Sequence, residues 1–209
     1  MFITFEGIDG CGKTTQSHRL AGALRAAGYD VVHTREPGGS PGAEEIRALI
    51  LSGEADRWSA ETEILLFTAA RRDHLERVIE PALARGAFVI CDRFADSTRV
   101  YQGAARASLR ETVDRLHSLM IGREPDLTII LDIDPDTALT RGMVRLASGK
   151  IDEGRFERMG LEFQKKLYQG FTALAKDHPE RCVAIPAKGE IDVVFQAVSA
   201  LVFQRIPPN

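Results

Sequence analysis

The N-terminal stretch Phe2–Thr15, FITFEGIDGCGKTT, joins a strand pattern to a glycine-rich turn. Its first four residues are apolar or β-branched, and Gly7–Thr14 matches the pattern G-x-x-x-x-G-K-[ST]. Glycines let the backbone turn its N–H groups inward around an anion, and the helix expected next adds the positive end of its dipole. We therefore expect a phosphate-binding loop, in which Lys13 contacts the β- and γ-phosphates of a nucleotide and Thr14 holds Mg²⁺.

Strand and helix patterns alternate along the rest of the chain. Helical spacing links Leu20 and Leu24 and ends at Gly28, while Pro81 should kink or end a long helix within 61–85. This alternation predicts an α/β protein of one domain, residues 1–209, with a parallel sheet covered by helices on both faces. The other expected strands are Val31–His33, Phe88–Cys91, Leu127–Ile133 and Cys182–Ile185, and further helices are expected over Arg110–Ile121 and Leu161–Lys176.

Composition narrows the class of protein. The 209 residues are 44% apolar and 27% charged, as in globular enzymes, and the net charge of −3 argues against a nucleic-acid coat or a polybasic membrane anchor. The odd number of dispersed cysteines, 3, predicts neither a disulfide framework nor a zinc site and is typical of a reducing cytoplasm. No apolar run approaches ~18 residues, so we expect no membrane span and no cleaved leader. Four histidines show no ligand-like grouping and receive no role: His18, His74, His117 and His178.

A carboxylate ends the strand pattern before Arg93. In a phosphate-loop fold such an aspartate lies beside the phosphates and supports the metal, which predicts this role for Asp92. Asp132, after the strand pattern TIIL, competes for the role, but Asp92 is preferred because a cation follows it directly. The alternative for Asp92 is a cap of the strand end.

The turn TREPGG, Thr34–Gly39, follows the second strand. Ligands of open α/β sheets bind at the carboxyl ends of the strands, so Arg35 is expected to bind a phosphate there. An ordinary surface ion pair is the alternative for this arginine.

Phe67 and Arg71 are four residues apart within a helical segment and share one face. An aromatic ring with a guanidinium one turn away can stack on a nucleobase and donate hydrogen bonds to its edge. The alternative is a core phenylalanine beside a surface arginine.

The polar segment ASGKIDEG, Ala147–Gly154, lies between helical patterns and is either a solvated loop or a mobile lid. Cations on a closing loop would neutralise charge on a transferring phosphoryl group, whereas on a solvated face they would have no such role. The cations around this segment are Arg141, Arg145, Lys150 and Arg155.

Together these motifs resemble those of the bacterial thymidylate kinases across nearly the whole chain. The stretches that carry the resemblance, in family order, are FITFEGIDGCGKTTQ, TREPGGSPGAEEIR, LLFTAARRDH, VICDRFADSTRVYQG, PDLTIILD and GLEFQKKLYQGF. The resemblance implies transfer of a phosphoryl group from ATP to dTMP with Mg²⁺. It also implies a three-layer fold with a five-stranded parallel sheet, a lid at about 146–155, and a homodimer that binds neither membrane nor nucleic-acid polymer.

The resemblance also implies roles for individual residues. Asp9 would contact the 3′-hydroxyl of dTMP, Arg35 and Arg93 its phosphate, and Tyr101 its sugar, where the ring disfavours a 2′-hydroxyl. The implied ATP site comprises Gly7, Ile8, Asp9, Gly10, Cys11, Gly12, Lys13, Thr14, Thr15 and Arg141. The implied dTMP site comprises Asp9, Glu36, Pro37, Phe67, Arg71, Arg93, Ser97, Thr98, Tyr101 and Gln102.

The phosphate loop carries no arginine, so the resemblance implies a catalytic lid cation, either Arg145 or Arg155. The lid departs from the family form, since it reads GRFE where DRFE is usual. A deoxynucleoside kinase is the alternative enzyme, and a nucleotide-dependent regulatory switch is the alternative from another class. The switch is disfavoured because the chain lacks an N-K-x-D motif for reading guanine.

Overall fold

A computed structural model describes residues 1–54, 57–106, 109–147 and 159–206 of the chain. Its centre is a five-stranded sheet in the order β2-β3-β1-β4-β5, and every neighbouring pair is parallel. This confirms the predicted fold class. The strands are β1 (Phe2–Glu6), β2 (Val31–Arg35), β3 (Phe88–Asp92), β4 (Leu127–Asp132) and β5 (Cys182–Pro186).

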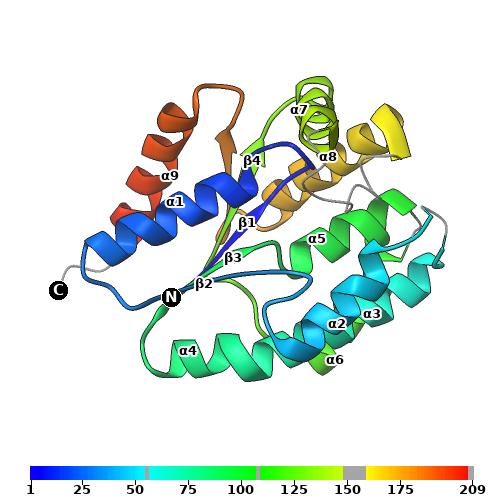
Figure 1. Cartoon of the computed structure of the whole chain (residues 1–209), viewed down its shortest axis with the longest axis horizontal. Coiled ribbons are helices and arrows are strands. Elements are labelled where there is room, and N and C mark those ends of the chain that lie inside the picture. Colours follow the sequence, from blue (N-terminus) through cyan, green and yellow to red (C-terminus); the bar gives the residue numbers. More distant parts are fainter. Residues whose placement is uncertain (55–56, 107–108, 148–158, 207–209) are drawn as a thin grey trace.

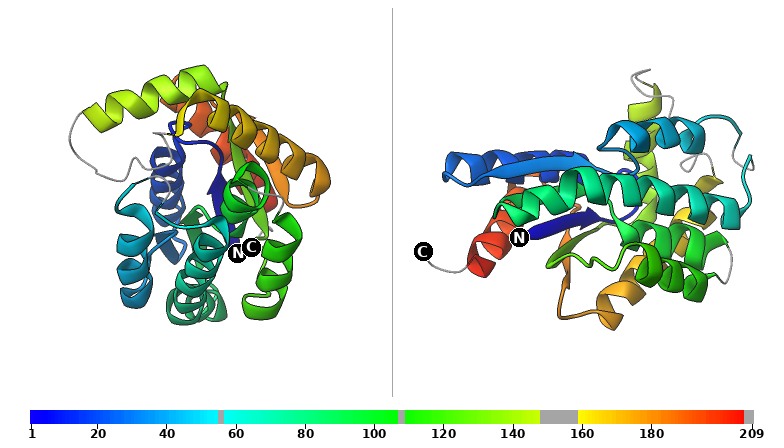
Figure 2. Two further views of the ribbon diagram at one scale, coloured as in Figure 1. Left: turned by 90° about the vertical axis from the view of Figure 1, so that its right-hand side faces the viewer. Right: turned by 90° about the horizontal axis from the view of Figure 1, so that it is seen from below.

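Helices cover both faces of the sheet (Figure 1, Figure 2). Helices α1 and α9 pack on one face, and α4, α5 and α8 lie on the other. The first helices are α1 (Lys13–Ala26), α2 (Pro41–Leu51), α3 (Ala60–His74), η1 (Leu75–Ile79, a π-helix) and α4 (Glu80–Ala84). The others are α5 (Ala95–Val100), η2 (Tyr101–Arg106, a π-helix), α6 (Arg110–Met120), α7 (Pro135–Ala147), α8 (Gly160–Asp177) and α9 (Ile191–Arg205).

Strand β1 is buried along its whole length because alternate side chains face two separate parts of the core. Ile3 and Phe5 belong to a core cluster that contains residues of α1 and α9, whereas Phe2 belongs to a second cluster with residues of η1 and α4 and with Phe94. Burial on both faces explains why the strand reads as a continuous apolar run in the sequence. At the end of α1, Gly28 has a φ of +90°, which confirms the glycine predicted to follow this helix.

The long helical run predicted over 61–85 continues past Pro81 and is neither ended nor broken there. The run consists of α3, the π-helical turn η1 and then α4, whose first turn contains Pro81. Proline has no backbone N–H to donate to the preceding turn, and a wider π turn lies directly before it. The structure therefore has a local change in helical winding just before Pro81 in place of the helix end considered for this residue.

The carboxyl ends of β1, β2 and β3 meet at one edge of the sheet. Asp92, the last residue of β3, is paired in register with Arg35 on one side and with Phe5 on the other. Residues that follow these strands are therefore brought to the same place. In the described part of the chain, no helix combines the length and apolar composition that a bilayer crossing would demand.

Candidate functional site

The glycine-rich loop joins β1 to α1 at this edge. Gly10 has a φ of +83°, and a Cβ atom there would lie 2.0 Å from the carbonyl oxygen of Ala138, so only glycine fits. Lys13 is buried, and its Nζ donates to the carbonyl oxygens of Gly7 at 3.0 Å and Ile8 at 2.9 Å. The loop thus holds a desolvated cation at the amino end of α1, where an anion is favoured.

A cavity of about 990 Å³ opens beside the loop. It collects most of the residues that the sequence predicted for the site, although they come from many parts of the chain. The predicted residues that line it are Asp9, Gly10, Gly12, Lys13, Thr14, Thr15, Arg35, Glu36, Pro37, Phe67, Arg71, Asp92, Arg93, Ser97, Thr98, Tyr101, Gln102 and Arg141. Gly7 and Ile8 line a smaller cavity of about 240 Å³ behind the loop, and Cys11 is buried.

Thr14 and Asp92 lie side by side in the lining of the large cavity. The Thr14 hydroxyl donates to Asp92 Oδ2 at 2.5 Å. The other oxygen, Oδ1, is buried and accepts no hydrogen bond within the described residues. A hydroxyl beside a carboxylate with a spare oxygen suits Mg²⁺, which takes oxygen ligands and keeps several from water and phosphate. The competing Asp132 lines the smaller cavity and not the large one.

Arg93 has an unusual backbone conformation and a crowded side chain. Its φ of 70° places it in the left-handed region, alone among the described residues other than glycine. Its guanidinium is ion-paired with Asp9 and donates to Ser97 Oγ at 2.9 Å and to the Tyr101 hydroxyl at 3.2 Å. Burial opposes the charge, but Tyr101 and Asp9 outweigh it and hold the pKa of Arg93 well above its ordinary value. Arg93 therefore remains a cation in a partly desolvated position.

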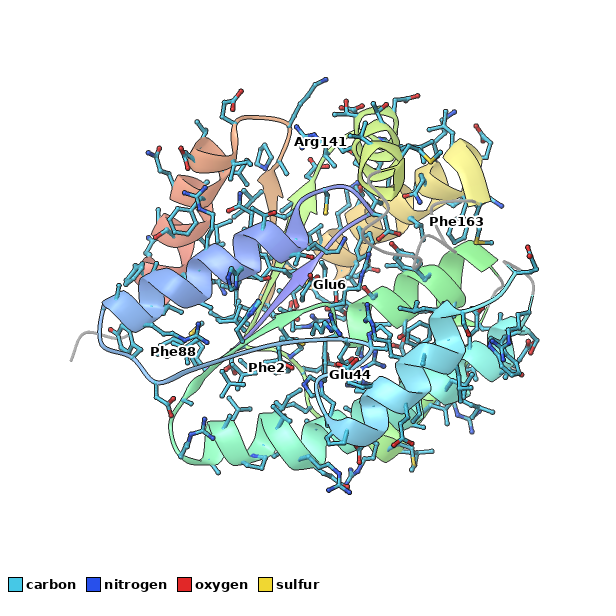
Figure 3. All side chains as sticks on the ribbon, viewed as in Figure 1. Phe2, Glu6, Glu44, Phe88, Arg141 and Phe163 are labelled. Carbon is cyan, nitrogen blue, oxygen red and sulfur yellow. The ribbon has the colours of Figure 1, made fainter. Side chains whose placement is uncertain are left out.

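Glu6, at the end of β1, supports the segment that follows Arg93, a role that the sequence analysis missed. Its carboxylate is fully buried near the centre of the molecule (Figure 3). It accepts hydrogen bonds from Phe94 N at 2.8 Å, Ser97 N at 3.3 Å and Ser97 Oγ at 2.6 Å. Burial and the nearby Asp96 raise the pKa of Glu6 to about 7. Its position directly before the loop glycine was the only signal in the sequence.

Phe67 and Arg71 both line the cavity from α3, as their spacing predicts. The alternative of a surface arginine is wrong, because Arg71 is only 3% exposed. Its Nε donates to Glu36 Oε2 at 2.8 Å and its Nη2 to Thr98 Oγ1 at 3.0 Å. A ring and a fixed guanidinium on one helix face are suited to stacking and edge recognition of a flat base.

Arg35, the last residue of β2, and Arg141, on α7, both line the cavity. Arg35 lines the cavity and is also half exposed and paired with Glu44 Oε2 at 3.1 Å, so the surface ion pair considered for it is present. Arg141, on α7, donates to the carbonyl oxygens of Ala187 and Lys188, both at 3.2 Å, in the segment that leads to α9 (Figure 3).

Parts of the prediction lie outside the described residues. These are Lys150, Arg155, nearly all of the expected lid, and the side chain of Arg145, whose backbone belongs to α7. Conversely, the cavity includes residues that the sequence analysis did not select. They are His18, His33, Thr34, Gly39, Glu44, Arg47, Leu51 and Phe94. Of these, Glu44 could have been found from the sequence, because it is an acid in the first turn of a helix that follows a glycine pair. A carboxylate there can accept hydrogen bonds from the backbone of the turn, and Glu44 accepts one from Gly39 N at 2.9 Å.

Comparison with known proteins adds a second line of evidence. A family model described as thymidylate kinase matches residues 5–198. The thymidylate kinase of Ruegeria pomeroyi is 60% identical over 99% of this chain and 96% of that protein. That of Dinoroseobacter shibae is 62% identical over 95% of each. A crystal structure of thymidylate kinase from Ehrlichia chaffeensis, 38% identical, superposes with a TM-score of 0.78 over 97% of this chain and 98% of that one. The chain therefore belongs to the thymidylate kinase family.

Proposed function

We propose that this protein catalyses transfer of the γ-phosphoryl group of ATP to dTMP, and that the large cavity holds both nucleotides. The observation that carries the proposal is the arrangement of cations in one cavity. Lys13 lies at its loop end, and Arg35, Arg71 and Arg93 line the part built by β2, α3 and the segment after β3. A volume of about 990 Å³ is ample for two nucleotide end groups brought together.

The loop end would bind the donor. The loop amides and Lys13 hold the β- and γ-phosphates, and Thr14 with Asp92 holds the metal, partly through water. Mg²⁺ held there would supply positive charge that neutralises the negative charge developing on the phosphates during transfer. Arg141 would contact the nucleoside part of ATP, because it lines the cavity from α7.

The opposite part of the cavity would bind the acceptor. Phe67 stacks on thymine and Arg71 donates a hydrogen bond to the edge of the base, while Arg93 and Arg35 bind the monophosphate. The other residues proposed to contact dTMP are Asp9, Glu36, Pro37, Ser97, Thr98, Tyr101 and Gln102, all of which line the cavity.

Catalysis would then rest on alignment and on charge. A phosphate oxygen is already nucleophilic at neutral pH, so no general base is needed. The protein must instead hold two mutually repelling anions in line. A lid cation, Arg145 or Arg155, would neutralise the remaining negative charge of the transition state. Closure of the lid would exclude water, which would otherwise hydrolyse ATP.

An acceptor panel tests this function. With ATP and Mg²⁺, a coupled ADP assay should show rapid turnover with dTMP and much slower turnover with dCMP, dGMP, UMP and thymidine. The position of dUMP in the series measures the contribution of the thymine methyl group. Thymidine as the best acceptor would indicate a deoxynucleoside kinase, and ADP release that no acceptor stimulates would indicate a regulatory switch.

A homodimer in the cytoplasm completes the proposal. Three exposed apolar side chains support the dimer: Leu49 on α2, Leu65 on α3 and Leu119 on α6. Helix α3 packs against both α2 and α6. Light scattering after gel filtration should give twice the chain mass, and the double variant Leu65→Glu, Leu119→Glu should give the monomer mass. The three cysteines, all unpaired and buried, support a reducing compartment.

A further inference from the structure

His74 is the last residue of α3 and is completely buried. Both of its ring nitrogens are engaged. Nδ1 lies 3.0 Å from Glu36 Oε1, and Nε2 lies 2.7 Å from Thr34 Oγ1. The imidazole thus bridges the hydroxyl of Thr34, near the end of β2, and the carboxylate of Glu36, the residue directly after β2.

The carboxylate that His74 contacts is shared with Arg71. Glu36 Oε1 faces His74, whereas Oε2 accepts from Arg71 Nε at 2.8 Å, and both side chains of this ion pair are 3% exposed. A buried ion pair is stable only when its remaining hydrogen-bonding groups are satisfied. His74 supplies the partner for the second oxygen and so fixes the plane of the carboxylate.

The orientation of Arg71 follows from this arrangement. Nε is held by Glu36 and Nη2 by Thr98 Oγ1 at 3.0 Å. The third nitrogen, Nη1, makes no hydrogen bond within the described residues, and Arg71 lines the cavity. A guanidinium is planar, so fixing two of its nitrogens also fixes the direction of the third.

His74 also supports the turn that follows Arg35. A Cβ atom at Gly39 would lie 2.4 Å from His74 Nε2 and 2.5 Å from Thr34 Oγ1, so the turn backbone packs directly on the imidazole. One buried side chain therefore contacts both the carboxylate that holds Arg71 and the turn that follows Arg35.

We propose that His74 is a positioning residue of the acceptor site, which holds Glu36 and, through it, the guanidinium of Arg71 toward the base. The inference rests on the proposed function, in which Arg71 donates to the thymine edge. An ionised Glu36 can only accept hydrogen bonds, so the proposal requires a proton on His74 Nδ1. In the neutral imidazole Nε2 then accepts from the Thr34 hydroxyl.

Two isosteric variants separate the contacts of His74. The amide nitrogen of His74→Asn takes the place of Nδ1 and keeps the bond to Glu36. The amide nitrogen of His74→Gln takes the place of Nε2 and keeps only the contact with Thr34. We expect His74→Gln to raise KM for dTMP about tenfold, as loss of a hydrogen bond to a charged group would, and His74→Asn to raise it less. In both variants the turnover number and the KM for ATP should stay within about twofold of the wild type. The preference for dTMP over dCMP should fall more in His74→Gln than in His74→Asn.

The matched control is His117→Gln. His117 is also buried and faces a carboxylate, Glu124, at 3.1 Å, but it lies on α6 and does not line the cavity. Its substitution should leave KM for dTMP unchanged. If both His74 variants match the wild type in KM and base preference while the wild type phosphorylates dTMP, the positioning role is wrong and the proposed function stands. If the wild type does not phosphorylate dTMP, the proposed function itself fails.

A spectroscopic readout covers the case in which the His74 variants do not fold. Long-range ¹H–¹⁵N correlation spectra of the wild type, with its 5 histidines, should show a proton on His74 Nδ1. Thr34→Val removes only the contact between His74 Nε2 and the Thr34 hydroxyl. It should therefore keep the proton on His74 Nδ1 while raising KM for dTMP about threefold. An unprotonated Nδ1 in the wild-type spectrum would overturn the proposal.

Discussion

The hydroxyl of Thr14 donates to the carboxylate of Asp92 at 2.5 Å, although the two residues are 78 positions apart in the sequence. Thr14 is the second residue of α1 and Asp92 is the last residue of β3, and the adjacency of β1 and β3 in the sheet brings them together. This pair joins the phosphate loop to the neighbouring strand at the point where a metal would be held.

Asp92→Asn should weaken use of the metal. It removes the charge of a carboxylate whose Oδ1 is buried without a hydrogen-bond partner in the described residues. We expect the Mg²⁺ concentration for half-maximal activity to rise at least tenfold, as for loss of a group that supports a metal. Titration of Mg²⁺ at fixed ATP measures it. Asp132→Asn is the control, since Asp132 lines the other cavity, and an equal effect of both substitutions would contradict the assignment.

Lys13→Ala should abolish nearly all turnover and preserve the fold. The side chain donates to two loop carbonyls in this structure and is assigned to the donor phosphates in the complex. Loss of such a preorganised cation costs roughly 10²–10³-fold in the turnover number. The coupled ADP assay measures the loss, and circular dichroism with a thermal melt checks the fold. Full activity in a folded variant would refute the role of the loop.

Arg93→Lys should reduce catalysis with dTMP although the charge is kept. A lysine cannot reproduce the planar set of donors that reaches Asp9, Ser97 and Tyr101 together. We expect kcat/KM for dTMP to fall roughly hundredfold, the size of effect seen when one preorganised donor is lost. Arg85→Lys is the matched control, because Arg85 is half exposed and pairs only with Asp30 among the described residues. Unchanged kinetics in Arg93→Lys would remove Arg93 from the acceptor site.

Glu6 should make stability depend on pH. Its pKa is raised from 4.5 to about 7 in the folded protein, so the folded state binds this proton more tightly than the unfolded state. The stabilisation is complete below pH 4.5 and is lost as the pH rises through 7. Between pH 5 and 8 this amounts to roughly 2–3 kcal/mol of unfolding free energy.

The variant Glu6→Gln has no titrating group at this position, so it should lack this part of the pH dependence. Urea unfolding of both proteins at several pH values between 5 and 8 gives the comparison. Parallel pH dependence in the two proteins would show that Glu6 has an ordinary pKa in the folded state.

Much of the fold was predictable because its signals are local. A strand pattern, a glycine-rich turn and helical spacing occur within a few residues of each other, and parallel strands buried on both faces read as continuous apolar runs. Four strands were predicted one or two residues short at their carboxyl ends, whereas the one predicted over Leu127–Ile133 was one residue too long, because β4 ends at Asp132. Where the prediction was short, Glu6, Arg35 and Asp92 are polar, so hydrophobicity alone ends the strand too early.

The buried polar network was not predictable in the same way. His74 was given no role because no histidine ligand motif surrounds it, yet Glu36 lies 38 positions away in the sequence and 3.0 Å away in space. Arg71 had a surface alternative because arginine is usually exposed, and its burial depends on this same Glu36. Such pairings leave no periodic trace in a single sequence.

The sequence by itself determined the class of fold, the phosphate loop and the set of residues from which the site is drawn, because backbone geometry and hydrophobic spacing act over short stretches of chain. Only the tertiary structure decided which carboxylate faces Thr14, which acid holds Arg71 and what supports Arg93. The strand order β2-β3-β1 brings these side chains together. Burial then makes each charge depend on the few partners within hydrogen-bonding distance.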